Sequence, residues 1–347
     1  MIPRSGAPCV IGLFFSAFAC WPGLGAAEEA SAAALTRALA AVEAKEGRAS
    51  PYLLPVIEQL AQLRLREGEL GEAASLRRRA LAIAVKKFGG ASASAAEAMA
   101  ALGAVEIDRR RYLDAEPLLI AAGNALAGRL APDQPVMVTI LAGRARIALA
   151  RGEIGPAEAF ARRAVEMARH NPHRRSTEAL RALGAALTMQ QRFNEAERVL
   201  GEALAQDREQ HGAEGIDTAR SLSQLAQLYL RQQKPQRALP LIQEAVAIDQ
   251  RRLGPAHPFI ADGFYDLGLV YDAMRRPDAA LRALTAALTV LERGAGRETV
   301  RVAYVELELA RIYRDQGLTE EAEAAGRDAR RILNKAEAEE RRREREV

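Results

Sequence analysis

Apolar side chains recur through most of the chain at the three- and four-residue spacing of amphipathic helices. Leu222, Leu225 and Tyr229 form one such stripe, and after a short polar interruption Ile242 and Val246 continue in another. The same succession of two stripes repeats from about residue 50 to residue 333. Because an amphipathic helix must cover its apolar face, this pattern predicts a series of helix hairpins, each packed against the next.

Three small residues mark the same places in seven successive units of this pattern. The first small residue of each predicted second helix is Ala73, Ala115, Ala157, Ala196, Ala238, Ala280 or Ala322. Another alanine follows seven residues later in every unit, and an alanine or glycine stands twelve residues earlier. The units are 42 residues apart except for one step of 39. Small side chains let antiparallel helices approach closely, so we predict an all-α fold of about seven hairpins.

The repeat resembles the tetratricopeptide repeat, and its 42-residue period resembles the long kinesin-light-chain subtype. The nearest matches are the loop Leu253–Pro258, the run Ser221–Tyr229 and the segment Ala115–Leu118. The resemblance covers about residues 50–333 and implies a right-handed α-solenoid. It also implies a concave groove, lined by the first helices, in which such arrays hold proteins or peptides.

Four segments are expected from this register: a signal peptide at 1–27, a leading helix at 28–49, the array at 50–333 and a charged helical tail at 334–347. The 39-residue step places a shortened connection at His170–Arg175.

The first 27 residues have the pattern of a secretory signal peptide. They carry one charge, Arg4, and the apolar run Val10–Trp21, which is too short to span a bilayer as a helix. Gly25 and Ala27 are small enough for a cleavage site, so we expect cleavage after Ala27. The expected location is therefore exported, either periplasmic or secreted.

Two alternatives remain open at this terminus. An uncleaved segment would act as a membrane anchor, and Ala17–Cys20 is similar to a lipoprotein box that would place a lipid on Cys20. Contact with a membrane is expected only in these two cases. Cys9 and Cys20 are the only cysteines, so cleavage after Ala27 leaves a chain without disulfides or thiolate metal sites.

Composition and charge narrow the classes of function. The 347 residues are 49% hydrophobic but only 5% aromatic, which favours helices over strands. The net charge of +4 is spread over both signs and is too small for a nucleic-acid-binding surface. The oligomeric state is left open.

No pattern typical of catalysis is found. Phosphate-binding, dinucleotide-binding, zinc-protease and hydrolase motifs do not occur, and His170 with His173 lacks an adjacent acid for a metal site. We expect neither a catalytic residue nor a metal or other cofactor, and we classify the chain as a non-enzyme. His257 is expected to make a structural hydrogen bond.

Candidate binding residues are those of the first helices that should face the groove. Arginine suits bidentate contacts with carboxylates, so an acidic protein or peptide is the expected partner. Glutamine, serine, tyrosine and aspartate side chains there are suited to hydrogen bonds with its main chain. The candidates are Arg146, Arg181, Arg220, Ser223, Gln224, Gln227, Tyr265, Asp266, Leu269 and Arg311.

The sequence thus predicts a non-catalytic scaffold or adaptor that binds a protein or peptide in its groove. Three alternatives stay open: a regulatory partner of a separately encoded envelope enzyme, such as a peptidase, a self-assembling structural protein, and an enzyme whose site no motif reveals. The partner and the pathway are not determined by the sequence, because groove chemistry varies freely on a repeat scaffold.

Overall fold

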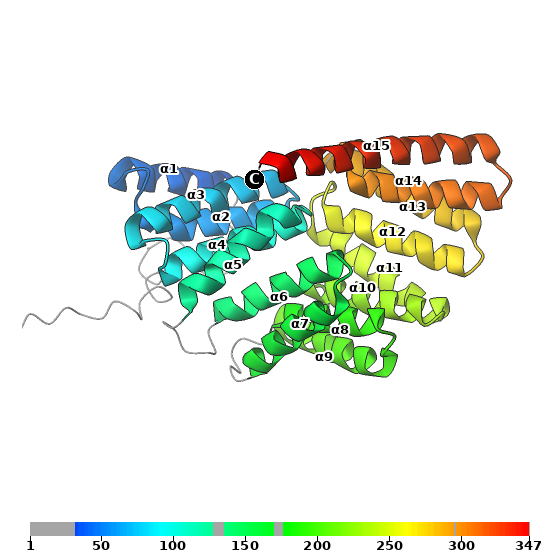
Figure 1. The fold of residues 1–347 in the computed structure, drawn as a ribbon, viewed down its shortest axis with the longest axis horizontal. Helices are drawn as coiled ribbons and strands as arrows, with labels where there is room; N and C mark the ends of the chain where they lie inside the picture. Colours follow the sequence, from blue (N-terminus) through cyan, green and yellow to red (C-terminus); the bar gives the residue numbers. More distant parts are fainter. Residues whose placement is uncertain (1–31, 128–134, 170–175, 295, 347) are drawn as a thin grey trace, which may run out of the picture.

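The computed structural model describes residues 32–127, 135–169, 176–294 and 296–346. The described part is helical and contains no strand. A leading helix, α1 (Ala32–Glu46), and a 3-10 turn (Pro51–Leu53) precede seven hairpins (Figure 1). The hairpins are α2 (Leu54–Arg66) with α3 (Leu70–Phe88), α4 (Ala93–Asp108) with α5 (Tyr112–Leu126), α6 (Pro135–Ala150) with α7 (Ile154–Arg169), α8 (Thr177–Met189) with α9 (Phe193–His211), α10 (Ile216–Arg231) with α11 (Pro235–Arg252), α12 (Pro258–Ala273) with α13 (Pro277–Gly294), and α14 (Val300–Asp315) with α15 (Thr319–Glu346).

Each helix packs against its neighbours in chain order, and first helices of adjacent repeats also meet: α4 with α6, α6 with α8, α8 with α10, and α10 with α12. This arrangement is an α-solenoid, as the sequence predicts, with the first helices on the inner side. The expected segments 1–27 and His170–Arg175 lie outside the described residues. Helix α15 continues through residues 334–346 without interruption.

The small residues of the sequence pattern lie where two helices touch. All fourteen alanines of the second helices in this pattern are buried, from Ala73 to Ala329. On the first helices, Gly103 and Gly268 stand against Leu119 and Leu284, so that an added Cβ would lie within 2.9 Å of the leucine side chain. The two helices of each hairpin therefore lie so close together that only a small residue fits at these positions.

The turn inside each hairpin has one residue in the left-handed conformation. These residues are Gly68, Arg110, Gly152, Gln191, Gln233, Arg275 and Gly317, with φ between 58° and 83°. They follow the same 42-residue register as the small residues, with the same single step of 39. The left-handed residue lets each chain reverse in a short turn and return as an antiparallel helix.

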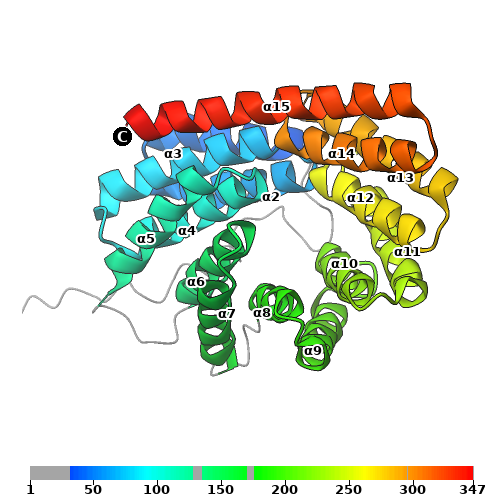
Figure 2. The ribbon, with the colours of Figure 1, turned by 45° about the vertical axis from the view of Figure 1, so that its right-hand side comes forward.

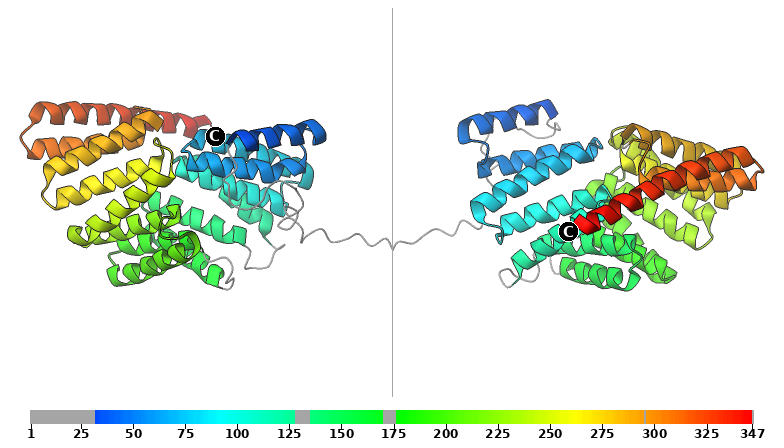
Figure 3. Two further views of the ribbon diagram at one scale, coloured as in Figure 1. Left: turned by 180° about the vertical axis from the view of Figure 1, so that it is seen from behind. Right: turned by 45° about the horizontal axis from the view of Figure 1, so that its top comes forward.

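The array curls far enough for its two ends to meet. The turn between α2 and α3 contacts the loop between α11 and α12, where the N–H of Gly254 donates to the carbonyl of Arg66 at 3.2 Å. Figure 2 shows the resulting ring, with α6–α9 opposite α2, α3, α12 and α14. From behind, the first and last repeats lie side by side along one edge (Figure 3). Among the described helices, none combines the length and apolar character needed to cross a membrane.

Candidate functional site

The inner side of the curled array carries an open hollow of about 380 Å³, lined by the first helices of repeats two to six and the turn after α4. This volume is in the usual range of ligand sites in proteins. Its polar lining consists of Asp108, Arg110, Tyr112, Arg146, Thr188, Gln224, Gln227, Arg231 and Asp262. Apolar side chains, including Phe259 and Met189, complete the wall. Among the predicted candidates, Arg146, Gln224 and Gln227 are thus brought together here.

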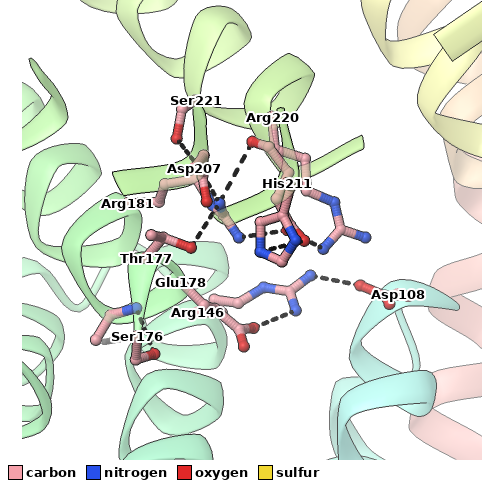
Figure 4. A network of polar contacts seen from close by, with 12 residues as sticks. Asp108, Arg146, Ser176, Thr177, Glu178, Arg181, Asp207, His211, Arg220 and Ser221 are labelled. Carbon is pink, nitrogen blue, oxygen red and sulfur yellow. Dashed lines mark hydrogen bonds and ion pairs between the residues drawn. The ribbon is translucent and has the colours of Figure 1, made fainter. Parts of the chain in front are cut away.

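Arg146 reaches the hollow from α6, but two carboxylates of the chain already hold it (Figure 4). Its guanidinium lies 2.6 Å from Asp108 and 3.1 Å from Glu178. Burial acts to lower the pKa of Arg146, but these two acids outweigh it and raise the pKa above its usual range. For Asp108 burial acts to raise the pKa, but the neighbouring Arg146 and Arg220 outweigh burial and lower the pKa. Both groups are therefore charged at neutral pH.

Arg181 belongs to a buried structural network and not to the hollow. Its guanidinium bonds Asp207 at 2.9 Å, Asp217 at 3.0 Å and Thr177 at 3.2 Å (Figure 4). Asp207 is fully buried and also accepts a hydrogen bond from Ser221 at 2.5 Å. These contacts join α8, α9 and α10, so Arg181 connects repeats four and five from inside.

Arg220 stacks on an aromatic ring across the array. Its guanidinium carbon lies 4.2 Å from the ring centre of Phe259, and one of its nitrogens lies 3.6 Å from Asp217. The Arg220 Nε is buried and makes no hydrogen bond. Arg220 therefore supports the wall of the hollow through Phe259, by a cation–π contact.

Gln227 and Asp266 form a pair at the back of the hollow. The Nε2 of Gln227 donates to Asp266 at 2.8 Å, and Asp266 is buried. Burial raises the pKa of Asp266 to about 7, with the Gln227 hydrogen bond opposing the rise and Asp262 adding to it. Burial also raises the pKa of Asp249 to about 7, and one Asp249 oxygen has no hydrogen-bond partner. Both carboxyl groups therefore hold their proton more strongly than an exposed aspartate does.

The remaining candidates lie elsewhere on the inner side. Ser223 is half-buried on α10, and Tyr265 and Leu269 are half-buried on α12. Burial raises the pKa of Tyr265 to about 12, with help from Glu308 and Asp266. Arg311 on α14 is held by Asp272 at 2.7 Å and Glu308 at 2.9 Å. The structure thus separates Tyr265, Leu269 and Arg311 from the hollow, although all three are on first helices.

Two arginines that line the hollow, Arg231 and Arg110, are not among the candidates predicted from the sequence. Arg231, at the end of α10, lines the hollow and makes no ion pair within the part of the chain that the structure describes. It also lines an adjoining hollow of about 410 Å³ at the turns of repeats four and five, together with Met189. Arg110 lies 3.7 Å from Asp262, which also contacts Arg301. The candidates were predicted from the positions close to the small residue of each first helix. Arg231 and Arg110 stand near the ends of first helices and lie beyond those positions.

Three carboxylates of first helices are already paired with arginines. Asp108, Asp262 and Asp272 each hold an arginine, so they neutralise cations that an acidic partner would use. Among the described residues no three acidic, histidine or cysteine side chains gather as metal ligands do. His257 makes structural hydrogen bonds, as expected: its Nδ1 accepts from the N–H of Phe259, so its Nε2 carries the proton and donates to Leu65.

Comparisons agree with this architecture. The sequence model of the tetratricopeptide repeat matches residues 175–251 and 231–293. No curated protein matches the sequence. The crystal structure of the Cut9–Hcn1 hetero-tetramer of APC/C is similar with a TM-score of 0.59 and 15% identity, over 88% of this chain and 50% of that chain. Aspartyl phosphate phosphatase F from Bacillus subtilis is similar with a TM-score of 0.56 and 13% identity, over 86% and 75%.

Putative kinesin light chain repeats from Podosopora anserina also match, with a TM-score of 0.42 and 21% identity, over 58% of this chain and 96% of that one. At these identities the likeness concerns the fold.

The stacked and curved hairpins place this protein in the class of helical repeat proteins. In this class the inner face of the array is available for other molecules. Residues 175–293 match the tetratricopeptide repeat in sequence, and the described residues have the helical-repeat fold of the similar solved structures. Its fold is typical of protein-interaction scaffolds.

Proposed function

We propose that this protein is a non-catalytic scaffold or adaptor that holds an acidic segment of a partner protein in the interior hollow. The observation that carries the proposal is the hollow itself, with polar side chains from five consecutive repeats converging on about 380 Å³. Five repeats contribute to one space, so the site exists only in the folded array.

The partner chemistry follows from which side chains are free. Arg231 has no carboxylate partner among the described residues and faces both hollows, so it is the cation that an incoming carboxylate meets first. Gln224 presents an amide suited to a peptide main chain, whereas the Nε2 of Gln227 already donates to Asp266. Phe259 and Met189 offer apolar contact beside them. An extended peptide with an acidic residue next to an apolar one fits this lining.

Site-specific photo-crosslinking tests the location of the partner. A benzophenone amino acid replaces Met189, which lines the hollow, or Ile120, which is comparably exposed on the second helix α5. In cells of the source organism we expect a crosslinked partner from position 189 and none from position 120. Arg231→Glu should abolish the crosslink, because it replaces the free cation by a like charge.

Crosslinks from position 120 alone would contradict binding in the hollow. Equal crosslinking at position 189 with and without Arg231→Glu would contradict an acidic partner. If the captured protein is an enzyme whose rate changes on binding, the adaptor is a regulatory partner of that enzyme.

We further propose that the protein is exported and processed after Ala27. The support is the sequence pattern of residues 1–27, with the small residues Gly25 and Ala27 before the first acids. Amino-terminal sequencing of protein from an envelope extract should begin at Glu28. A start at Cys20 would instead show a lipoprotein, and an intact Met1 would contradict processing.

A further inference from the structure

Two edges of the array that are far apart in sequence make direct contact. One edge is the turn Arg66–Gly68 between α2 and α3, and the other is the loop Gly254–His257 between α11 and α12. The Nε2 of His257 donates to the carbonyl of Leu65 at 2.8 Å. The N–H of Gly254 donates to the carbonyl of Arg66 at 3.2 Å. A third contact, 3.7 Å long, joins Arg110 of repeat two to Asp262 of repeat six.

The backbones of the two edges approach as closely as glycine permits. A Cβ on Gly254 would lie 2.5 Å from the carbonyl oxygen of Glu67, and a Cβ on Gly68 would lie 2.9 Å from the Cα of His257. Gly68 also adopts φ +83°, but Gly152 and Gly317 do so at equivalent turns with nothing within 4 Å. Close approach therefore distinguishes the first turn from the equivalent turns of repeats three and seven.

The same contact forms part of the wall around the interior hollow. Arg110, Phe259 and Asp262 line the hollow; Phe259 and Asp262 follow the loop closely in sequence, and Arg110 contacts Asp262. His257 places Phe259 by accepting its N–H, and the rings of the two residues lie 4.7 Å apart. Separating the edges would therefore open the hollow on this side.

A solenoid does not need such a contact in order to fold. Each hairpin is stabilised by its neighbours in the array, so the contact between repeats one and six adds to a structure that is already complete. Its direct polar contacts are few, and Asp262 holds Arg110 and Arg301 as a partner carboxylate would. A ligand that binds the open form better shifts such an equilibrium by its difference in affinity.

We propose that the contact between the Arg66–Gly68 turn and the Gly254–His257 loop is a reversible latch that narrows the hollow on one side in the free protein. An acidic segment of the partner enters when the latch opens and replaces Asp262 on Arg110 and Arg301. The entry of an acidic partner segment rests on the proposed function, whereas the latch itself does not.

Pulsed electron paramagnetic resonance tests the latch without a ligand. Spin labels are placed on Lys87→Cys and Arg282→Cys, which are exposed on second helices of repeats one and six, in a chain with Cys9 and Cys20 replaced by serine. Gly254→Val should shift the main distance to longer values, because its side chain meets Glu67. The matched variant Gly90→Val, in an inter-repeat loop with open space, should keep the short distance. An unchanged distance in Gly254→Val would overturn the latch.

Binding of an acidic probe tests access to the hollow. The probe is fluorescein-labelled hexaglutamate, and the matched variants are Gly254→Val, whose side chain meets Glu67, and Gly90→Val, which has open space. We expect Gly254→Val to bind the probe at least tenfold more tightly than Gly90→Val.

The two measurements separate the two ideas. Equal probe binding to Gly254→Val and Gly90→Val would overturn entry through the latch. A long distance in Gly254→Val together with no probe binding to that variant supports the latch and contradicts the acidic ligand of the proposed function. Tighter probe binding to Asp262→Asn than to the wild type supports the replacement of Asp262, and weaker binding contradicts it.

Discussion

His257 donates a hydrogen bond from Nε2 to the carbonyl of Leu65, although 192 residues separate them. The bond requires a neutral ring, because Nδ1 accepts from Phe259 while Nε2 donates to Leu65. Burial lowers the pKa of His257 to about 4, with the hydrogen bond to Leu65 opposing the shift and Arg220 adding to it. One neutral imidazole thus caps α12 and joins the sixth repeat to the first.

This relationship predicts a loss of stability in acid. Because the folded pKa lies below the unfolded value, the contribution of His257 is complete above about pH 6.5 and is lost as pH falls through 4. Relative to His257→Asn, the wild type should lose about 2–3 kcal/mol between pH 7 and pH 3. Urea unfolding of both proteins at each pH measures the difference. Parallel losses would show that Asp108 and Arg301, which also influence this ring, compensate.

Arg181 is expected to contribute to the stability of the fold and not to direct contact with a ligand. Arg181→Ala leaves Asp207 buried without its cation, so we expect a loss of about 3–5 kcal/mol. The double variant Arg181→Ala, Asp207→Ala should regain much of this loss. Arg146→Ala, whose partners are partly exposed, should cost about 1 kcal/mol or less. Additive losses in the double variant would contradict a coupled pair.

The stability that Asp266 contributes depends on pH with the opposite sign to that of His257. Its raised pKa means that its stabilising contribution is complete below about pH 3.8 and is lost as pH rises through 7. Asp266→Asn keeps an acceptor for Gln227 and removes the charge. The variant should be more stable than the wild type by about 2–4 kcal/mol at pH 8 and nearly equal to it at pH 4. Thermal unfolding at both values checks this, and a less stable variant at pH 8 would show that the charge is needed.

Two glycines test the packing inside a hairpin. A Cβ on Gly184 would overlap the Leu200 side chain, so Gly184→Ala should destabilise the protein by about 1–3 kcal/mol. Gly201 is exposed within α9 and has nothing within 4 Å, so Gly201→Ala should stabilise by about 0.5–1 kcal/mol through helix propensity. Both changes add one methyl group to a helix, and their difference in urea midpoint isolates the contact. Similar midpoints would contradict tight packing at Leu200.

A glycine at one of the left-handed turn positions should stabilise the folded protein. Gln233 is exposed and adopts φ +58°, where a side chain is strained and glycine is not. Gln233→Gly should therefore stabilise by about 0.5–1 kcal/mol after the entropy of glycine in the unfolded chain is subtracted. At the equivalent turn of repeat three, Gly152→Ala should destabilise by a similar amount. Calorimetric melting of the two variants should move in opposite directions.

The sequence by itself determined the hairpin and its repetition. Ala115 and Gly103 predict a close helix contact because apolar spacing and side-chain size act over a few turns of helix. That first helices face inward also follows from this register, and Arg146, Gln224 and Gln227 line the hollow.

The tertiary structure decided what those positions contact. Arg181 is a candidate groove residue by register, yet Asp207 and Asp217 hold it inside the array. Arg231 shows the reverse, since nothing in the local pattern marks it as the free cation. The curvature of the array is the sum of small rotations at every repeat interface, so no single segment encodes the meeting of His257 with Leu65.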